Sequence, residues 1–291
     1  MRQRLIVTVT GAVVLLPLLS GTSSGQNNDA FLGPAQNRTS KPAVVKPTPR
    51  WPDGRVNLGT SPGEKGHWIR TRRELVVDAN TNAANVLPTD LKVENIPFQP
   101  WSKALFEYRR TKDDRDSPHA RCKPDAGPRE IGTAYGFEMV EFPDTQRVVI
   151  FGIGGPQTFR TIYMDGRPHP SGRDLVPTYL GHSVGRWEGD TLVVDSVGFN
   201  ERTWIDAEGL MHTDQYHQIE RFTRTDFNTL KYEVTIDDPG AYTAKWTAGF
   251  LLRWTAGSEL FEYVCQANNM NPDMTTGDDG APLSRANGFT P

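Results

Sequence analysis

The second half of the chain consists of short runs in which hydrophobic and polar residues alternate, and turn residues end each run. Alternation with a period of two predicts half-buried β-strands. The expected strands cover residues 135–142, 147–153, 158–164, 182–187, 191–199, 216–224, 230–236, 243–254 and 259–266. Since no helical pattern separates them, they predict an antiparallel meander. Closing so many strands removes the exposed edges, so we expect an all-β, calycin-like β-barrel, with a β-sandwich as the alternative.

Two further elements are expected before this meander. Residues 68–77 alternate in the same way and predict a first strand. A short helix is predicted to begin at Pro100, because Trp101, Leu105 and Tyr108 recur at helical spacing. We therefore expect one short helix before the barrel.

The two ends of the chain differ in composition from its middle. Residues 1–25 combine basic residues, an apolar run and small residues, which is the pattern of a secretory signal peptide, and the run is shorter than the about 20 residues of a membrane span. Residues 26–66 are rich in Pro and Gly and are expected to form an extended arm. Residues 67–266 then form a single β-rich domain, and 267–291 a flexible polar tail. We expect a periplasmic or secreted protein with no integral membrane segment after signal cleavage.

The charge of the chain bears on nucleic-acid binding, and its cysteines bear on whether a disulfide forms. The chain carries 32 basic and 35 acidic residues, so its formal charge is 32 − 35 = −3, without the basic footprint of a nucleic-acid-binding protein. Cys122 and Cys265 are the two cysteines. In an oxidising compartment they are expected either to form a disulfide, which in the chain-entropy model stabilises the fold by about 4 to 5 kcal/mol, or to remain as two buried thiols.

The segment Gly181–Gly185 fits the nucleophile-elbow pattern of serine hydrolases, and Asp206, His212 and His217 follow it in a suitable order. The elbow requires a strand that turns into a helix, whereas a β-hairpin is predicted here. The alternative interpretation is the start of a strand in which the glycines permit close packing. We favour that alternative.

Polar residues near this hairpin are the best candidates for acid–base chemistry. His182, His217 and Glu220 are the first choices, with Arg160 and Asp195 as electrostatic or orienting partners. On one strand, Tyr216, Gln218, Glu220 and Phe222 share a face, while His217, Ile219 and Arg221 share the other. If the aromatic face is interior, Glu220 is a buried carboxylate with a raised pKa; otherwise it is a surface charge.

Three of these features have alternatives that the sequence leaves open. Histidines from different strands, such as His182 with His217, could hold a divalent metal, although their spacing fits no recognised local signature. Arg160 either binds a substrate carboxylate or joins a hairpin end to its neighbour. His169 lies between two prolines and is expected to be an exposed loop histidine.

Three longer stretches carry a resemblance to a known group of proteins. Residues 162–170, 181–195 and 232–239 resemble a large uncharacterised family of exported bacterial proteins, and the likeness extends over about Pro97 to Cys265. The resemblance implies export and one β-rich domain. It transfers no catalytic residue.

Taken together, the patterns predict an exported β-barrel that acts on a small organic or carbohydrate-derived molecule by acid–base chemistry of the lyase, isomerase or hydrolase type. One alternative is a lipocalin-like protein that binds a ligand without catalysis, which predicts an apolar interior with few convergent polar groups. Another is a carbohydrate-binding or envelope module, which predicts an exposed strip of Trp and Tyr side chains.

Overall fold

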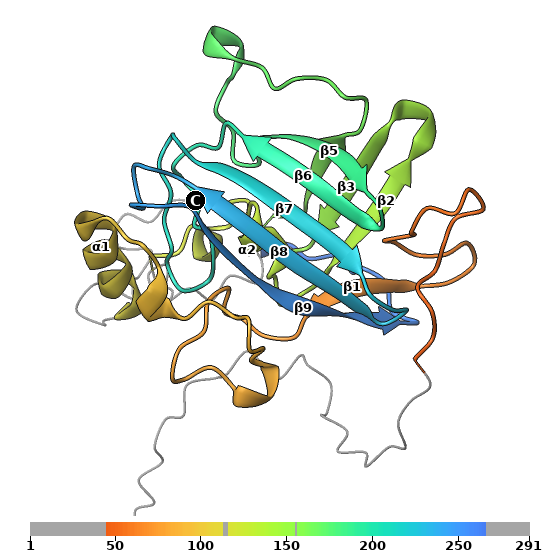
Figure 1. Cartoon of the computed structure of the whole chain (residues 1–291), viewed down its shortest axis with the longest axis horizontal. Helices are drawn as coiled ribbons and strands as arrows, with labels where there is room; N and C mark the ends of the chain where they lie inside the picture. Colours follow the sequence, from red (N-terminus) through yellow and green to blue (C-terminus); the bar gives the residue numbers. More distant parts are fainter. Residues whose placement is uncertain (1–44, 113–115, 155, 266–291) are drawn as a thin grey trace, which may run out of the picture. The chain divides into compact units, whose positions relative to one another are not determined.

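The computed structural model describes residues 45–112, 116–154 and 156–265. The predicted signal peptide, the first part of the arm and the polar tail from 267 lie outside the described residues. Within these residues, nine strands form a closed barrel in chain order, and one helix of more than a single turn precedes β2 (Figure 1). The strands are β1 (Gly66–Arg70), β2 (Phe137–Phe142), β3 (Arg147–Gly152), β4 (Thr158–Tyr163), β5 (His182–Glu188), β6 (Thr191–Val197), β7 (His217–Arg224), β8 (Thr229–Asp237) and β9 (Trp246–Ala256). The prediction of an all-β barrel with one short helix is confirmed.

The barrel closes because β1 pairs on both of its sides. Gly66–Arg70 runs antiparallel to the end of β9, and Trp68 pairs with Phe137 of β2. All neighbouring strands are antiparallel except β4 and β5, which are parallel over a short register that includes Ile162 opposite Ser183. The connection 164–181 causes this exception, since it returns the chain to the end of the barrel at which β4 began.

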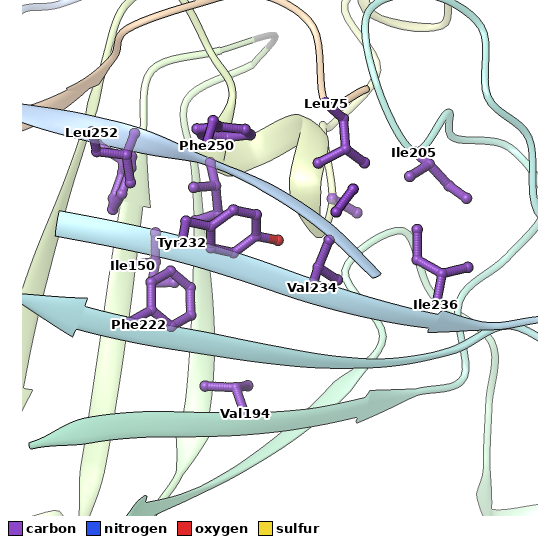
Figure 2. Close-up of a cluster of buried hydrophobic side chains, with 14 of the residues drawn as sticks. Leu75, Ile150, Val194, Ile205, Phe222, Tyr232, Val234, Ile236, Phe250 and Leu252 are labelled. Carbon is purple, nitrogen blue, oxygen red and sulfur yellow. The ribbon is translucent and has the colours of Figure 1, made fainter. Parts of the chain in front are cut away.

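Alternate residues of each strand fill the interior. On β8, Leu230, Tyr232, Val234 and Ile236 are all buried, and their neighbours along the strand are more exposed. Figure 2 shows Tyr232, Val234 and Ile236 in one cluster with labelled side chains from β3, β6, β7 and β9. Burial of this apolar surface is the main stabilising contribution to the fold.

The described residues also form two helices that are not part of the sheet. Helix α1 (Pro100–Arg110) packs Phe106 against Phe98 with a ring separation of 5.2 Å. Helix α2 (Pro128–Ile131) is a single turn, and all four of its residues are buried. Short 3-10 turns occur at Ala83–Asn85, Val93–Asn95, His119–Arg121, Pro143–Thr145 and Gly172–Asp174.

The ends of the described chain differ from two sequence expectations. Val56 and Leu58, within the predicted arm, are each only 1% exposed and belong to the hydrophobic core. Residues 259–265 do not form the predicted strand. Instead, the rings of Phe261 and Tyr263 both contact the ring of Tyr135. A disulfide joins Cys122 to Cys265 and anchors this segment, so of the two alternatives for these cysteines the structure has the bridge and not two buried thiols. Among the described residues, no helix is long and apolar enough to cross a membrane.

Candidate functional site

A cluster of three histidines and one aspartate lies on the outer face of the barrel wall. His182 comes from β5, Asp195 from β6 and His217 from β7, all at outward-facing positions. His169 reaches them from the connection that follows β4. We call these four residues the outer cluster; three of its side chains, His169, Asp195 and His217, are between 21% and 34% exposed.

The strand register brings these side chains together. Asp195 pairs with Val184 of β5 on one side and Ile219 of β7 on the other, so its neighbours His182 and His217 are two residues away on the adjacent strands. Diagonal neighbours on one face of a sheet lie within reach of long side chains. Gly181 allows the chain to enter β5 at this point, because its φ is +67° and a Cβ there would lie 2.8 Å from the Val197 carbonyl oxygen, which leaves no room for a side chain.

Hydrogen bonds link the outer cluster into one chain. Asp195 Oδ1 lies 2.7 Å from His217 Nε2 and 3.1 Å from His169 Nε2, and His169 Nδ1 lies 2.8 Å from His182 Nδ1. A carboxylate only accepts, so Nε2 of both His169 and His217 carries a proton in this arrangement. With neutral rings, His182 must then donate from Nδ1 to His169. This leaves lone pairs on His182 Nε2 and His217 Nδ1, which are suited to accept a proton from a substrate.

The surroundings of His182 favour its neutral form. Burial lowers the pKa of His182, and the nearby His169 and Arg167 lower it further. Tyr163 stacks on the His182 ring at 5.3 Å, and Arg167 lies 3.9 Å from the centre of the Tyr163 ring. Arg167 also binds Asp165, and this ion pair lies just after the end of β4. A neutral imidazole on the barrel surface is suited to act as a general base at neutral pH.

A second polar group lies inside the barrel. Arg160 of β4 binds Glu220 of β7 through two contacts, Nη1 to Oε2 at 2.7 Å and Nη2 to Oε1 at 3.1 Å. The Tyr232 hydroxyl donates to Glu220 Oε1 at 3.0 Å. Glu130 of α2 approaches from the other side, with its Oε2 3.0 Å from Arg160 Nε. Arg160 is 2% exposed and Glu220 is fully buried. We call Glu130, Arg160 and Glu220 the inner triad.

Glu130 differs from its partner carboxylate. Burial raises the pKa of Glu130 to about 8, although Arg160 acts to lower it, and the charges of Glu220 and Asp125 raise it further. Neither of its carboxyl oxygens accepts a hydrogen bond from a described residue. Two carboxyl groups therefore share the guanidinium of Arg160. Glu220 accepts two hydrogen bonds from it and one from Tyr232, whereas Glu130 only approaches its Nε. Glu130 is the group that keeps its proton at neutral pH.

The structure separates the five residues that the sequence suggests into two sets. Glu220 faces inward with Gln218 and Phe222, as one of the two open registers requires, and Arg160 joins it. His182, Asp195 and His217 face outward. Because the strands themselves lie between the two sets, a single substrate cannot contact both.

His169 is the member of the outer cluster that sequence reasoning missed. Its position between two prolines indicates a loop. The loop is held beside the segment that follows β6 by the bonds of Thr178 N to the Gly198 carbonyl and of Asn200 N to the Thr178 carbonyl. The sequence signal for the outer cluster is that His182, Asp195 and His217 each fall on the outward-facing side of a predicted strand. This signal says nothing about the course of the loop that carries His169.

The other candidates have structural partners. Ser183 points into the barrel, where its hydroxyl is 2.8 Å from that of Ser196, so Gly181–Gly185 is a strand start and not a nucleophile elbow. His212 is buried, with Nε2 2.8 Å from the Thr203 hydroxyl. Among the described residues, no group of three or more His, Cys, Asp or Glu side chains is arranged to hold a metal ion. In the outer cluster, the two nitrogens of His169 face different partners and not a common centre.

Comparison with known proteins adds no assignment: neither a family model, nor a curated protein, nor a solved structure matches this chain.

Proposed function

We propose that this protein is an exported enzyme that performs general acid–base chemistry on a small organic or carbohydrate-derived molecule, as a lyase, isomerase or hydrolase. The outer cluster is the proposed site. The observation that carries the proposal is the carboxylate of Asp195, which holds the rings of His169 and His217 in one tautomer while His169 meets His182. A carboxylate that fixes the tautomer of an imidazole is a recurring arrangement in acid–base catalysis.

In this proposal each residue has a separate role. His182 accepts a proton from the substrate at Nε2, and His217 holds the second reactive nitrogen, Nδ1. Asp195 orients the rings of His169 and His217 and stabilises the positive charge that develops when either ring gains a proton. His169 connects His182 to Asp195, so a proton gained at His182 is stabilised through His169 by the Asp195 carboxylate.

Export is the second part of the proposal. The basic and apolar pattern of residues 1–25, the resemblance to exported bacterial proteins, and the disulfide between Cys122 and Cys265 all support a periplasmic or secreted location.

The two alternative functions receive less support from the described residues. A lipocalin-like ligand would occupy the barrel interior, where Ile131 of helix α2 and inward side chains of the strands other than β5 form the core. A carbohydrate-binding strip would require Trp and Tyr on the barrel wall. The most exposed aromatic side chains there are Phe142 and Phe159, while Trp101 and Tyr108 lie on α1.

The test is a turnover screen with a matched set of variants. The panel contains uronate-containing oligosaccharides, 4-nitrophenyl glycosides, esters and lactones. We expect Asp195→Asn and His217→Gln to reduce kcat/KM about 100-fold or more for any compound that the wild type converts. Glu233→Gln is the control, because Glu233 also faces outward on the neighbouring strand β8 and pairs only with Lys231 among the interactions seen. Unchanged turnover in Asp195→Asn would refute the proposed site.

A further inference from the structure

Helix α2 occupies one end of the barrel interior. Its N-cap, Gly127, has a φ of +53°, and a Cβ there would meet the Gln218 side chain at 2.4 Å. At the other end of the helix, a Cβ on Gly132 would lie 3.6 Å from Phe250. Between them, Glu130 lies against Gly152 and Arg160. These partners are inward-facing residues of β3, β4, β7 and β9, so α2 fills the space that the strands enclose.

Attachments to the wall lie on both sides of this helix. The segment is tied by the Cys122–Cys265 disulfide before the helix and by the bond from Arg70 Nη1 to the Gly132 carbonyl after it, at 2.9 Å. Within the helix, Gly132 N donates to the Pro128 carbonyl at 2.8 Å and Ile131 N to the Gly127 carbonyl at 3.3 Å. A single turn of this kind has no independent stability, so it remains in place only through its contacts with the barrel.

Among the residues of α2, Glu130 is the one whose ionised form would be unfavourable inside the barrel. The charged groups that act on it are Arg160 from β4, Glu220 from β7, and Asp125 from the preceding loop, while the Tyr232 hydroxyl of β8 donates to Glu220. The charge of Arg160 is already bound by Glu220, and Asp125 lies beside His119, at 2.8 Å, and Arg129. An ionised Glu130 would therefore add a second negative charge to a sealed space, without a hydrogen-bond donor of its own among the described residues.

We propose that α2 is a proton-controlled plug: protonated Glu130 keeps the helix seated in the end of the barrel, and loss of that proton favours its release into solvent. Release moves Glu130 into water, where it ionises, and it uncovers Arg160 and Glu220. The device would make the barrel interior more accessible at neutral and alkaline pH than at acidic pH.

The sign and size of the effect follow from proton linkage. The pKa of Glu130 is about 8 in the seated helix and near the ordinary value of 4.5 after release. Between these values the released form has lost a proton that the seated form keeps. The equilibrium constant for release therefore rises about tenfold per pH unit, and it levels off above the upper value.

Native-state amide hydrogen exchange of the full-length protein between pH 5.5 and 7.5 tests this proposal. The probes are the amides of Ile131 and Gly132, with the amide of Val234 in β8 as the reference for opening of the whole barrel. In the wild type we expect the protection factors of the two helix amides to lie well below that of Val234 and to fall about tenfold per pH unit. Glu130→Gln, which imitates the protonated side chain, should abolish the slope. Glu107→Gln is the control, since its carboxyl on α1 is 64% exposed.

Two results would overturn the proposal. One is an equal slope in the wild type and Glu130→Gln; the other is loss of protection at Ile131 and Val234 together, which would mean that the helix leaves only when the barrel unfolds. Infrared spectroscopy gives an independent measurement on the wild type. A protonated carboxyl band at pH 7 that is missing from Glu130→Gln supports the plug, and absence of that band from the wild type contradicts it.

Discussion

The inner triad predicts that its three members contribute unequally to stability. Arg160→Met removes the guanidinium and leaves Glu220 in a fully buried position with the Tyr232 hydroxyl as its remaining donor. Breaking a buried ion pair from one side costs about 3 to 5 kcal/mol, because the remaining charge has lost its partner. At roughly 2 to 4 °C per kcal/mol for a domain of this size, the melting temperature should fall by about 10 °C.

Glu220→Gln should cost less than Arg160→Met, and the geometry gives the reason. When the charge of Glu220 is removed, Glu130 is already 3.0 Å from Arg160 Nε and can ionise in its place. The pKa of Glu130 then falls from about 8, and Arg160 keeps one carboxylate partner. We expect a loss of about 2 kcal/mol, the order of a hydrogen bond to a charged group. The double variant Arg160→Met/Glu220→Leu should recover much of the loss, since apolar residues of similar volume often replace a buried pair well.

Urea unfolding at pH 7, followed by tryptophan fluorescence, measures these differences as shifts in the midpoint. The matched control is Arg221→Met on the outer face of β7, whose partner Glu188 is 3.0 Å away with both side chains about 40% exposed. This surface pair should contribute at most about 1 kcal/mol. The reasoning fails if Arg160→Met costs no more than Arg221→Met, or if Glu220→Gln costs as much as Arg160→Met.

Three further predictions concern the disulfide and the outer cluster. Replacing Cys122 and Cys265 with Ser should lower the free energy of unfolding by up to about 5 kcal/mol in the chain-entropy model, given a sequence separation of 143, and urea unfolding under oxidising and reducing conditions would measure it. Gly181→Ala should destabilise the fold by about 1 to 3 kcal/mol, because it combines a positive φ with a close backbone contact; an unchanged urea midpoint would contradict this. Arg167→Gln should raise the pKa of His182, since Arg167 is one of the groups that lower it, and an NMR titration that shows no rise would exclude this influence.

Most of the barrel could be predicted because its strands follow one local rule. Strands such as β7 and β8 have one side that is buried, and alternation in the sequence records this directly. Alternation does not record direction, which is why the parallel pairing of Ile162 with Ser183 was not foreseen. It also does not distinguish a strand from an irregular segment with aromatic residues, as 259–265 shows.

The parts that could not be predicted depend on contacts between distant residues. Helix α2 is too short to leave a periodic pattern, so its place inside the barrel is not visible in the sequence. Because the position of α2 is not visible, the sequence does not indicate Glu130 as a buried carboxyl group. His169 joins the outer cluster only because residues 164–181 turn back over β5 and β6, and no local signal gives the course of such a loop.

The same alternation that made the barrel predictable also separates its two polar sets. Val194 and Glu220 pair on the inner face, and the next residue of β6, Asp195, lies on the outer face. The inner triad is sealed in the core and acts on stability, whereas the outer cluster is partly exposed and can meet a substrate. Arg160→Met should therefore lower the amount of folded protein but leave kcat/KM per folded molecule unchanged, while Asp195→Asn should do the reverse. If instead Arg160→Met lowered kcat/KM per folded molecule as strongly as Asp195→Asn, the reaction would depend on the barrel interior, and the outer cluster would not be the complete site.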